Sequence, residues 1–334
     1  MQGGVGVRVF EADDQERVIE LLQAAFGGWP RYVEGVTPED FFRWKHVTGA
    51  FGPSIGLVAE IDGAIVGFYA LTTWRLRIAG RPVRTNRSVD LAVDPTARRR
   101  GVSMALIEAS PEHFPPDVIF SWGNPNELSR GGVLKAGRPE LDGLPRFASL
   151  GLAPLGWIGR ALRKGSTMRK QLPVRARGAA EALLDGPGIT RLLESVPEPS
   201  DRYVTAKDLE FLRWRYGHLS EYRALTAEVA GRCAGLAIFR VHRHGRFWIS
   251  HVSELLVEHG QPRIARRLLR QVRRAAATDL VTCAFPSRSQ AARCGFLDVP
   301  GGKRLMTNPL RSGIAPDPAL AASWELSLGD IELL

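Results

Sequence analysis

The sequence predicts an α/β protein built around an α+β mixed sheet. This unit occurs twice in the chain, and the second copy is degenerate. Over roughly residues 5–155, strand-like and helix-like patterns follow the order strand, two helices, three antiparallel strands, helix, strand, helix and strand. Residues 225–239 (LTAEVAGRCAGLAIF) align without gaps on residues 57–71 (LVAEIDGAIVGFYAL), and residues 211–214 (FLRW) echo residues 41–44 (FFRW). Motifs that repeat in the same order indicate two copies of one unit.

Each element of the first copy has a local signal. Asp13 or Asp14 can cap a first helix that ends before Gly27, and Thr37 followed by Pro38 begins a second helix. Asp62-Gly63 is a type I′ turn signal between two strands. The other expected elements are a strand over residues 5–10, a hairpin that turns at Gly80, a central strand over residues 88–93, a helix from about Val102, a strand over residues 118–121 and a short helix that ends at residues 136–137.

The most informative stretch joins the central strand to the helix that follows it, over residues 88–109 (SVDLAVDPTARRRGVSMALIEA). Its basic loop ends at Gly101, directly before the helix. The free N–H groups of a first helical turn and the helix dipole favour an anion there, and a glycine lets a phosphate approach the backbone. Arginines at a helix N-terminus are disfavoured by the dipole, so the three arginines at residues 98–100 indicate an anionic ligand.

The pattern Arg98-x-x-Gly101-x-Ser103 resembles the pyrophosphate loop of the GNAT acyltransferase superfamily, Q/R-x-x-G-x-G/A, and departs from it only in its final serine. Residues 120–137, with a Pro-Asn-Glu segment, resemble a subset of the same family. The resemblance covers roughly residues 5–155 and implies acetyl-CoA, or another acyl-CoA, as co-substrate. It implies coenzyme contacts from Leu91, Ala92, Val93, Arg98, Arg99, Arg100, Gly101, Val102, Ser103 and Asn126.

The second copy differs where the resemblance would place the coenzyme. Residues 252–257 (VSELLV) match the central strand, with Glu254 in the place of Asp90. The helix that follows has no glycine near its start, and Pro262 removes an N–H donor there. We therefore expect a coenzyme-binding catalytic domain at residues 1–158, a basic linker with one helix at 159–200, a second GNAT-like domain at 201–310 and a tail at 311–334.

Asp90 is the candidate general base, acting directly or through water. Pairing of its carboxylate with Arg84 or Arg87 is an equally weighted structural alternative. The resemblance also implies a β-bulge in the central strand that frees an N–H near Leu91 to Val93 to polarise the thioester carbonyl.

The expected site lacks the residue that usually acts as general acid. Many GNAT enzymes place a tyrosine four residues before a motif glycine, and Val133 stands at that position here. The polar substitutes nearby are Ser129, Asn126 and Ser121, and the more distant tyrosines are Tyr69 and Tyr32. His242 and His244 flank an expected hairpin turn, so we assign them no metal and expect none in the protein.

Composition restricts the class of protein. The 334 residues carry 45 Lys and Arg against 35 Asp and Glu, a formal net charge of +10, so acidic partners need consideration. No apolar run reaches the roughly 18 residues of a membrane span, and the N-terminus has no export pattern. The three cysteines lack disulfide or zinc spacing. We therefore expect reduced thiols and a cytoplasmic location.

The leading hypothesis is an acyl-CoA-dependent N-acyltransferase of the GNAT family, with acetyl as the favoured acyl group. Its acceptor would be a small amine, an amino sugar or a natural-product amine. The alternatives are a Fem-type transferase that uses aminoacyl-tRNA, which the basic linker could attract, and a non-catalytic coenzyme A-binding or scaffold protein. The coenzyme-like loop argues against tRNA as the donor. The sequence predicts neither the acceptor nor the oligomeric state.

Overall fold

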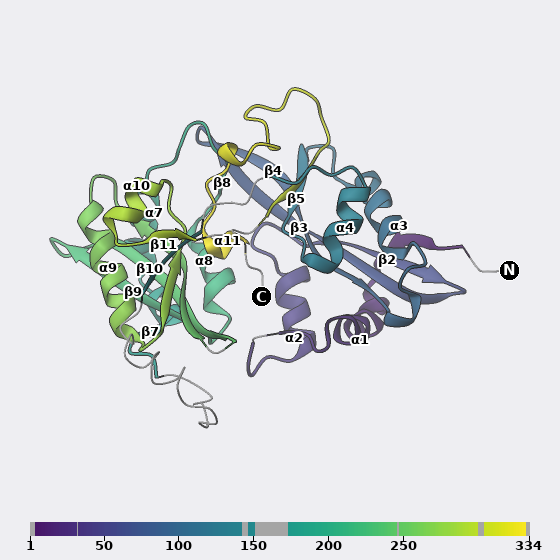
Figure 1. Cartoon of the computed structure of the whole chain (residues 1–334), viewed down its shortest axis with the longest axis horizontal. Helices are drawn as coiled ribbons and strands as arrows, with labels where there is room; N and C mark the ends of the chain where they lie inside the picture. Colours follow the sequence, from purple (N-terminus) through teal and green to yellow (C-terminus); the bar gives the residue numbers. More distant parts are fainter. Residues whose placement is uncertain are drawn as a thin grey trace.

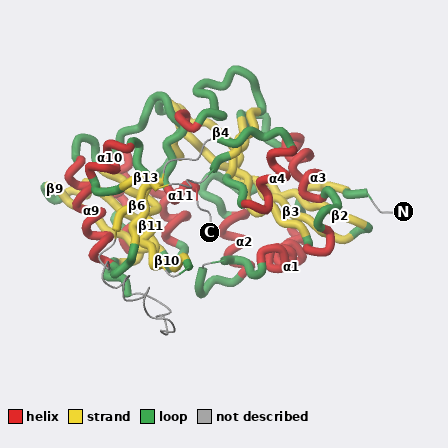
Figure 2. Tube along the Cα trace, in the orientation of Figure 1, coloured by secondary structure: helices red, strands yellow, loops and turns green. Residues whose placement is uncertain are grey.

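The computed structural model describes residues 4–31, 33–141, 146–150, 173–245, 247–299 and 304–331. Two mixed sheets lie side by side along the long axis, one built mostly from the first half of the chain and one mostly from the second half (Figure 1). Helices flank both sheets, and helix α11 near the C-terminus lies at the centre of the molecule (Figure 2). The predicted mixed α/β fold is confirmed.

The first sheet has the strand order β1-β2-β3-β4-β5-β14, with β8 paired to β3. Only the β4–β5 pair in it is parallel. Its strands are β1 (Gly6–Val9), β2 (Ile55–Ile61), β3 (Ala64–Ile78), β4 (Arg81–Val93), β5 (Phe120–Gly123), β8 (Val204–Thr205) and β14 (Met306–Pro309). The helices associated with it are α1 (Gln15–Phe26), α2 (Pro38–Phe42), a π-helical turn at Arg43–Val47, α3 (Val102–Ala109) and α4 (Glu127–Lys135).

The second sheet repeats this plan in the order β13-β6-β12-β11-β10-β9-β7, with β11 and β12 parallel. Its strands are β6 (Arg146–Leu150), β7 (Arg177–Gly178), β9 (Tyr222–Val229), β10 (Arg232–His244), β11 (Phe247–Val257), β12 (Leu280–Cys283) and β13 (Leu297–Val299). Its helices are α6 (Ala179–Ala182), α7 (Gly186–Ser195), α8 (Leu209–Leu212), a π-helical turn at Arg213–Gly217, α9 (Pro262–Ala275), α10 (Arg288–Arg293) and α11 (Leu328–Ile331).

Several local signals of the sequence act where they were expected, although Asp14 accepts the Glu11 N–H and does not cap α1 with its side chain. Gly27 ends α1 in the left-handed conformation, with φ of 66°, and the Thr37 hydroxyl accepts the Asp40 N–H at the start of α2. Asp62 and Gly63 both have positive φ, 50° and 77°, as a type I′ turn requires. These predicted boundaries are confirmed because each depends on the backbone preference of a few adjacent residues.

Each sheet contains a strand from the other half of the chain. Strand β6 (Arg146–Leu150) follows the first sheet in sequence but pairs with β12 and β13 of the second. Strand β14 (Met306–Pro309) follows the second sheet and pairs with β5 of the first. The expected boundaries at residues 158 and 310 stay predictions, and the first part of the expected basic linker, residues 159–172, lies outside the described residues. Because of this exchange, every experiment below uses the full chain.

The two halves meet at an approximate two-fold contact between Trp44 and Trp214. The indole N–H of Trp44 donates to the Trp214 carbonyl (2.7 Å), and that of Trp214 donates to the Trp44 carbonyl (3.0 Å). The two rings stack with centroids 5.3 Å apart. One apolar cluster includes buried residues of both halves. The repeated Arg-Trp motif of the sequence is therefore the packing contact that joins the copies.

Candidate active site

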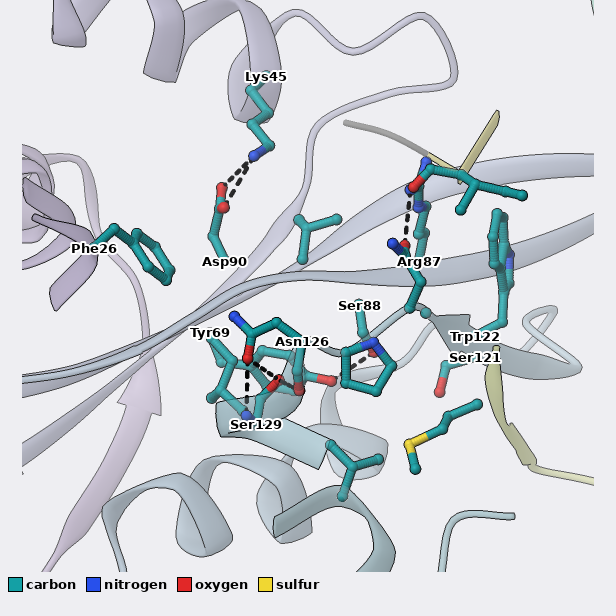
Figure 3. Close-up of a pocket in the computed structure, with 18 of the residues that line it drawn as sticks. Phe26, Lys45, Tyr69, Arg87, Ser88, Asp90, Ser121, Trp122, Asn126 and Ser129 are labelled. Carbon is teal, nitrogen blue, oxygen red and sulfur yellow. Dashed lines mark hydrogen bonds and ion pairs between the residues drawn. The ribbon is translucent and has the colours of Figure 1, made fainter. Parts of the chain in front are cut away.

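A cavity of about 560 Å³ lies where strands β4 and β5 diverge. The two strands pair only from Asn86 to Ser88 on β4 and from Ser121 to Gly123 on β5, so a gap opens beyond this pairing. The wall includes side chains of both strands and of α4 (Figure 3). Residues of β10, in the other half of the chain, also line it. Residues from both halves of the chain therefore form the cavity.

A β-bulge in β4 shapes one wall of this cavity. Phe68 of β3 pairs with Ala92 and Ala70 pairs with Val89, so Asp90 and Leu91 together oppose Tyr69. Asp90 has φ of 46°, a left-handed conformation that is uncommon for a residue other than glycine. The structure thus contains a bulge at the start of the segment where the family resemblance placed one.

Asp90 forms a buried ion pair with Lys45 (Figure 3). The Lys45 ammonium lies 2.8 Å from the carboxylate, and His46 Nε2 lies 3.0 Å from the same Asp90 oxygen. Only 3% of the Lys45 side chain and 11% of the Asp90 side chain are exposed. The alternative partners are engaged elsewhere, since Arg84 pairs with Asp117 and Arg87 donates to Asn124.

Burial and the interactions among Asp90, Lys45 and His46 determine the pKa values of these three groups. Burial by itself would raise the pKa of Asp90, but the Lys45 cation and the His46 hydrogen bond hold that pKa far below its usual range. Burial lowers the pKa of His46 and of Lys45, and Asp90 opposes this effect for both groups. The cavity wall therefore carries a carboxylate that stays ionised at ordinary pH.

Sequence reasoning missed Lys45 and His46, although the internal repeat contains a signal for them. The segment Arg43-Trp44-Lys45-His46 matches residues 213–216 (RWRY), so a cation and a ring follow the tryptophan in both copies. In the second copy the Tyr216 hydroxyl donates to Glu254 (2.6 Å), just as His46 contacts Asp90. In each half the π-helical turn thus presents a polar ring to the acid of the central strand.

A second polar group of the cavity centres on Tyr69 of β3. Its hydroxyl lies 2.6 Å from Ser88 Oγ and accepts a hydrogen bond from Arg138 (3.1 Å). Val133 lines the same cavity at the position where a tyrosine was sought. Tyr69 is therefore the tyrosine that the described structure brings to this cavity, whereas Tyr32 lies outside the described residues.

Two of the three polar substitutes suggested for the general acid, Asn126 and Ser129, line the cavity. They also cap helix α4, because the Asn126 side-chain oxygen accepts the Ser129 N–H (2.9 Å) and the Ser129 hydroxyl (3.1 Å). Ser121 contributes a buried side chain from β5 to the same wall. Asn126 and Ser129 therefore stabilise the start of α4 at the cavity wall.

The loop before α3 has the open geometry that an anion needs. Arg99 and Gly101 have positive φ, 65° and 83°, and Gly101 directly precedes the helix. No atom lies within 4 Å of the point where a Gly101 side chain would begin. The side chains of residues 98–100 are exposed, although Arg98 also donates to the Ala25 carbonyl (3.3 Å). The residues present therefore fit a phosphate group that approaches the helix N-terminus.

The equivalent cleft of the second half is partly filled by the C-terminal segment. Lys207 bridges Glu254 of β11 (2.8 Å) and Asp330 of α11 (2.9 Å), and both carboxylates are 1% exposed. Gly329 packs so closely that an added Cβ would clash with the Tyr216 hydroxyl. Helix α9 begins with Pro262, as the sequence predicted, and so lacks one N–H donor. Both features support the expectation of a degenerate second copy.

No cluster of three or more His, Cys, Asp or Glu side chains within the described residues could hold a metal ion. In that same part of the chain, no helix combines the length and apolar character needed to cross a membrane. All three cysteines are free thiols.

Comparison with known proteins shows similarity to one family model and to several solved structures. A family model described as an acetyltransferase (GNAT) domain matches residues 6–122. A GCN5-related N-acetyltransferase from Anabaena variabilis has a TM-score of 0.61 at 12% identity, over 92% of this chain and 73% of that chain. A probable N-acyltransferase from Enterococcus faecalis has a TM-score of 0.60 at 12% identity, over 92% and 72%.

A third solved structure, Eis1 from Mycobacterium abscessus, has a TM-score of 0.55 at 14% identity and covers 92% of this chain and 73% of that chain. No curated protein matches the sequence. At these identities the solved structures support the fold, and the family model identifies the domain. Residues 6–122 therefore match the GNAT acetyltransferase domain model, and the chain shares its fold with GCN5-related N-acetyltransferases.

Proposed function

We propose that the protein is an acyl-CoA-dependent N-acyltransferase that moves an acetyl group to a small amine. This proposal rests on the position of β4, which runs from the cavity to the loop before α3. The strand bears the bulged, ionised Asp90 inside the cavity and leads, through Leu91 to Val93, to the open loop before α3. One strand thus connects a candidate acceptor site with a candidate phosphate site.

The loop would hold the diphosphate of the coenzyme. The backbone N–H groups of Gly101, Val102 and Ser103 lie at the start of α3, and the arginines at residues 98–100 would offset the phosphate charge. The β4 edge from Leu91 to Val93 would pair with the pantetheine arm in the gap beside β5. When bound, the coenzyme supplies an acyl group as a thioester.

The residues of the cavity would then assist the transfer. The amine nitrogen forms a bond to the acyl carbon as the carbon–sulfur bond breaks. An N–H freed by the β4 bulge would stabilise the charge that develops on the carbonyl oxygen. Asp90 would accept and orient the amine proton that is lost. Tyr69, which receives a hydrogen bond from Arg138, is our candidate to protonate the leaving thiolate.

Acetyl-CoA binding by the full chain tests this proposal, and Gly101→Val is the decisive variant. A side chain there would stand between the backbone donors and the phosphate, and the loss of one charge-assisted hydrogen bond should raise the Kd by about 10- to 100-fold. Calorimetry measures this change. Wild-type protein at a hundredfold excess of acetyl-CoA over its Kd should gain about 2.7 kcal/mol of stability.

Gly260→Val is the matched control. Gly260 lies two residues before helix α9, has φ of 75° and has open space where a Cβ would stand, so valine there meets the same backbone strain as at Gly101 without facing the first turn of α3. Its replacement should leave the acetyl-CoA Kd unchanged. Equal affinities for the wild type and Gly101→Val, with circular dichroism showing both folded, would falsify the phosphate-loop assignment.

A further inference from the structure

We propose that helix α9 binds the phosphate backbone of a double-stranded nucleic acid through its exposed arginines. This surface is separate from the candidate active site, and the inference does not depend on the proposed acyl transfer. It rests on three features of the described structure, namely a row of arginines without carboxylate partners, the electrostatic cost of that row within the helix and the burial of the apolar face of α9.

The solvent-facing side of α9 carries a row of positive charges. Five arginines of this helix are exposed, which are Arg263, Arg266, Arg267, Arg270 and Arg274. Most neighbours in this set are three or four residues apart, so their side chains lie on one side of the helix. At a rise of 1.5 Å per residue, the set extends over about 16 Å. We call these five residues the α9 arginine row.

No ion pair joins the α9 arginine row to a carboxylate in the part of the chain that the structure describes. The sequence has no acid between Glu258, before the helix, and Asp279, after it. Both of these acids are engaged elsewhere. Glu258 pairs with Arg232 (3.4 Å), and Asp279 accepts the Trp248 N–H (2.8 Å). The flanking acids therefore do not neutralise the row.

Two surface arginines of the first half show the contrasting arrangement. Arg77 pairs with Glu198 at 2.7 Å, and Arg84 pairs with Asp117 at 3.1 Å. Such pairs offset the charge of an arginine within the protein itself. The α9 arginine row has no such internal compensation, so its charge is directed at ligands from solution.

The row also lowers the stability of the helix that carries it. Like charges three or four residues apart on a helix repel each other. Arg263 lies in the first turn, where the helix dipole disfavours a cation, and no acid in that turn offsets it. A polyanion laid along the helix would relieve both effects. The arrangement is therefore suited to an external anion and unfavourable for the isolated helix.

The opposite face of α9 is not available for insertion into a lipid bilayer. Ile264, Leu268, Leu269 and Val272 are buried in the core of the second half. Stable attachment of a helix to a bilayer combines charge with inserted apolar side chains, and α9 offers the charge alone. Phosphate contacts by themselves are sufficient for sequence-independent binding of a nucleic acid. These features favour a nucleic acid over a membrane as the partner.

The residue types of α9 further define the nucleic acid. The planar guanidinium of arginine can donate two parallel hydrogen bonds to one phosphate. Proteins that bind single strands add aromatic side chains on which the bases stack, and α9 contains no aromatic residue. A duplex, whose bases are stacked on each other and whose phosphates face outward, therefore fits this surface better than a single strand.

The α9 arginine row lies far from the loop proposed for the coenzyme. Helix α9 is at the outer end of the second half, whereas α3 lies in the first half toward the opposite end of the molecule (Figure 1). A duplex bound at α9 would thus not cover the loop before α3. The two ligands can therefore be tested together on the full chain.

The test measures binding of the full chain to a short fluorescein-labelled duplex, prepared as DNA and as RNA in two unrelated sequences. Anisotropy titrations are made with and without coenzyme A, which would occupy the loop before α3. We expect binding in both conditions, with the same affinity for both sequences. The logarithm of the association constant should fall linearly with the logarithm of the salt concentration, with a slope of about 0.9 for each phosphate contact.

Arg266→Gln/Arg270→Gln should weaken this binding by about 10- to 100-fold at about 0.1 M salt and reduce the salt slope by about 2, because two phosphate contacts are lost. Glutamine is a good helix former, so α9 should persist. Arg77→Gln/Arg84→Gln is the matched control. It removes the same charge from arginines that have acidic partners, so the affinity should not change. Circular dichroism checks that both variants are folded.

Four results would overturn the inference. The first is absence of binding to both duplexes, and the second is equal affinity of the wild type and Arg266→Gln/Arg270→Gln. The third is loss of duplex binding in the presence of coenzyme A, because the loop before α3 would then be the site. The fourth is a preference for another polyanion at equal charge. Vesicles of phosphatidylcholine and phosphatidylserine test for a membrane, and soluble polyglutamate tests for an acidic protein.

Discussion

Asp90→Asn is expected to lower the rate of acyl transfer by about 10²- to 10⁴-fold, the usual contribution of a group that accepts a proton in the transition state. The carboxylate lines the cavity and lies at the β4 bulge. Acetyl-CoA affinity should change little, because the phosphate loop lies several residues farther along the chain, beyond the end of β4 at Val93. Free-thiol release with an accepted amine measures the rate, and calorimetry measures the affinity.

The same substitution removes the partner of a buried cation, so its effect on stability must be separated from its effect on turnover. Lys45 is 3% exposed, and breaking a buried pair costs about 3–5 kcal/mol. The double variant Lys45→Met/Asp90→Asn leaves neither charge and should recover most of the melting temperature. Turnover should remain low in the double variant. Recovery of turnover with stability would show that Asp90 acts only by pairing with Lys45.

The pH dependence follows from the depressed pKa of Asp90. The unfolded chain has an ordinary aspartate pKa near 3.9, and the folded pKa lies far below its usual range. The stabilisation from this pKa difference is therefore complete above about pH 4 and is lost as the pH falls further. Because Asp90 stays ionised in an ordinary assay, Asp90→Asn should lower the plateau of the pH–rate profile without moving its acidic limb.

Lys207→Met is expected to reduce the free energy of unfolding by about 3–5 kcal/mol, because it leaves two buried carboxylates without their shared cation. Glu254 and Asp330 are each 1% exposed, and Lys207 lies within 2.9 Å of both. Urea unfolding measures the loss. Lys135→Met at the exposed end of α4 is the control, and it should change stability by less than about 0.5 kcal/mol.

This destabilisation should grow as the pH rises. Burial holds the pKa of Glu254 above its usual range, Asp330 raises it further, and Lys207 opposes both effects. Removal of Lys207 therefore raises the folded pKa again, above the unfolded value near 4.3. A group with a raised folded pKa loses its stabilisation as the pH increases. The difference between wild type and variant should thus be larger at pH 8 than at pH 5. A difference independent of pH would contradict a buried carboxylate as the cause.

Several features of this protein were accessible from the sequence alone because they depend on neighbouring residues. The turn at Asp62-Gly63 and the helix start at Thr37 follow from backbone preferences and a side chain that reaches two or three residues along the chain. The basic loop before α3 combines strand, glycine and helix within one stretch. The internal repeat predicted a second sheet with the same order of elements.

The central charges of the candidate site could not be found in this way. Lys45 and His46 are separated from Asp90 by more than forty residues, and a basic residue on an aromatic helix has many possible partners in a sequence. The two roles expected for Asp90, general base or partner of Arg84 or Arg87, therefore did not include Lys45, with which it pairs. The left-handed bulge at Asp90 and the packing of the π-helical turn decide which side chains meet.

The sequence by itself determined the local elements, the duplication and the loop suited to an anion. Only the tertiary structure decided that β6 and β14 exchange sheets, that the C-terminal segment fills the second cleft and that β10 completes the cavity of the first half. The physical reason is that the backbone groups of any strand can pair with any exposed sheet edge. Which edge a strand meets depends on how the two halves pack across Trp44 and Trp214, and no single stretch of sequence encodes that packing.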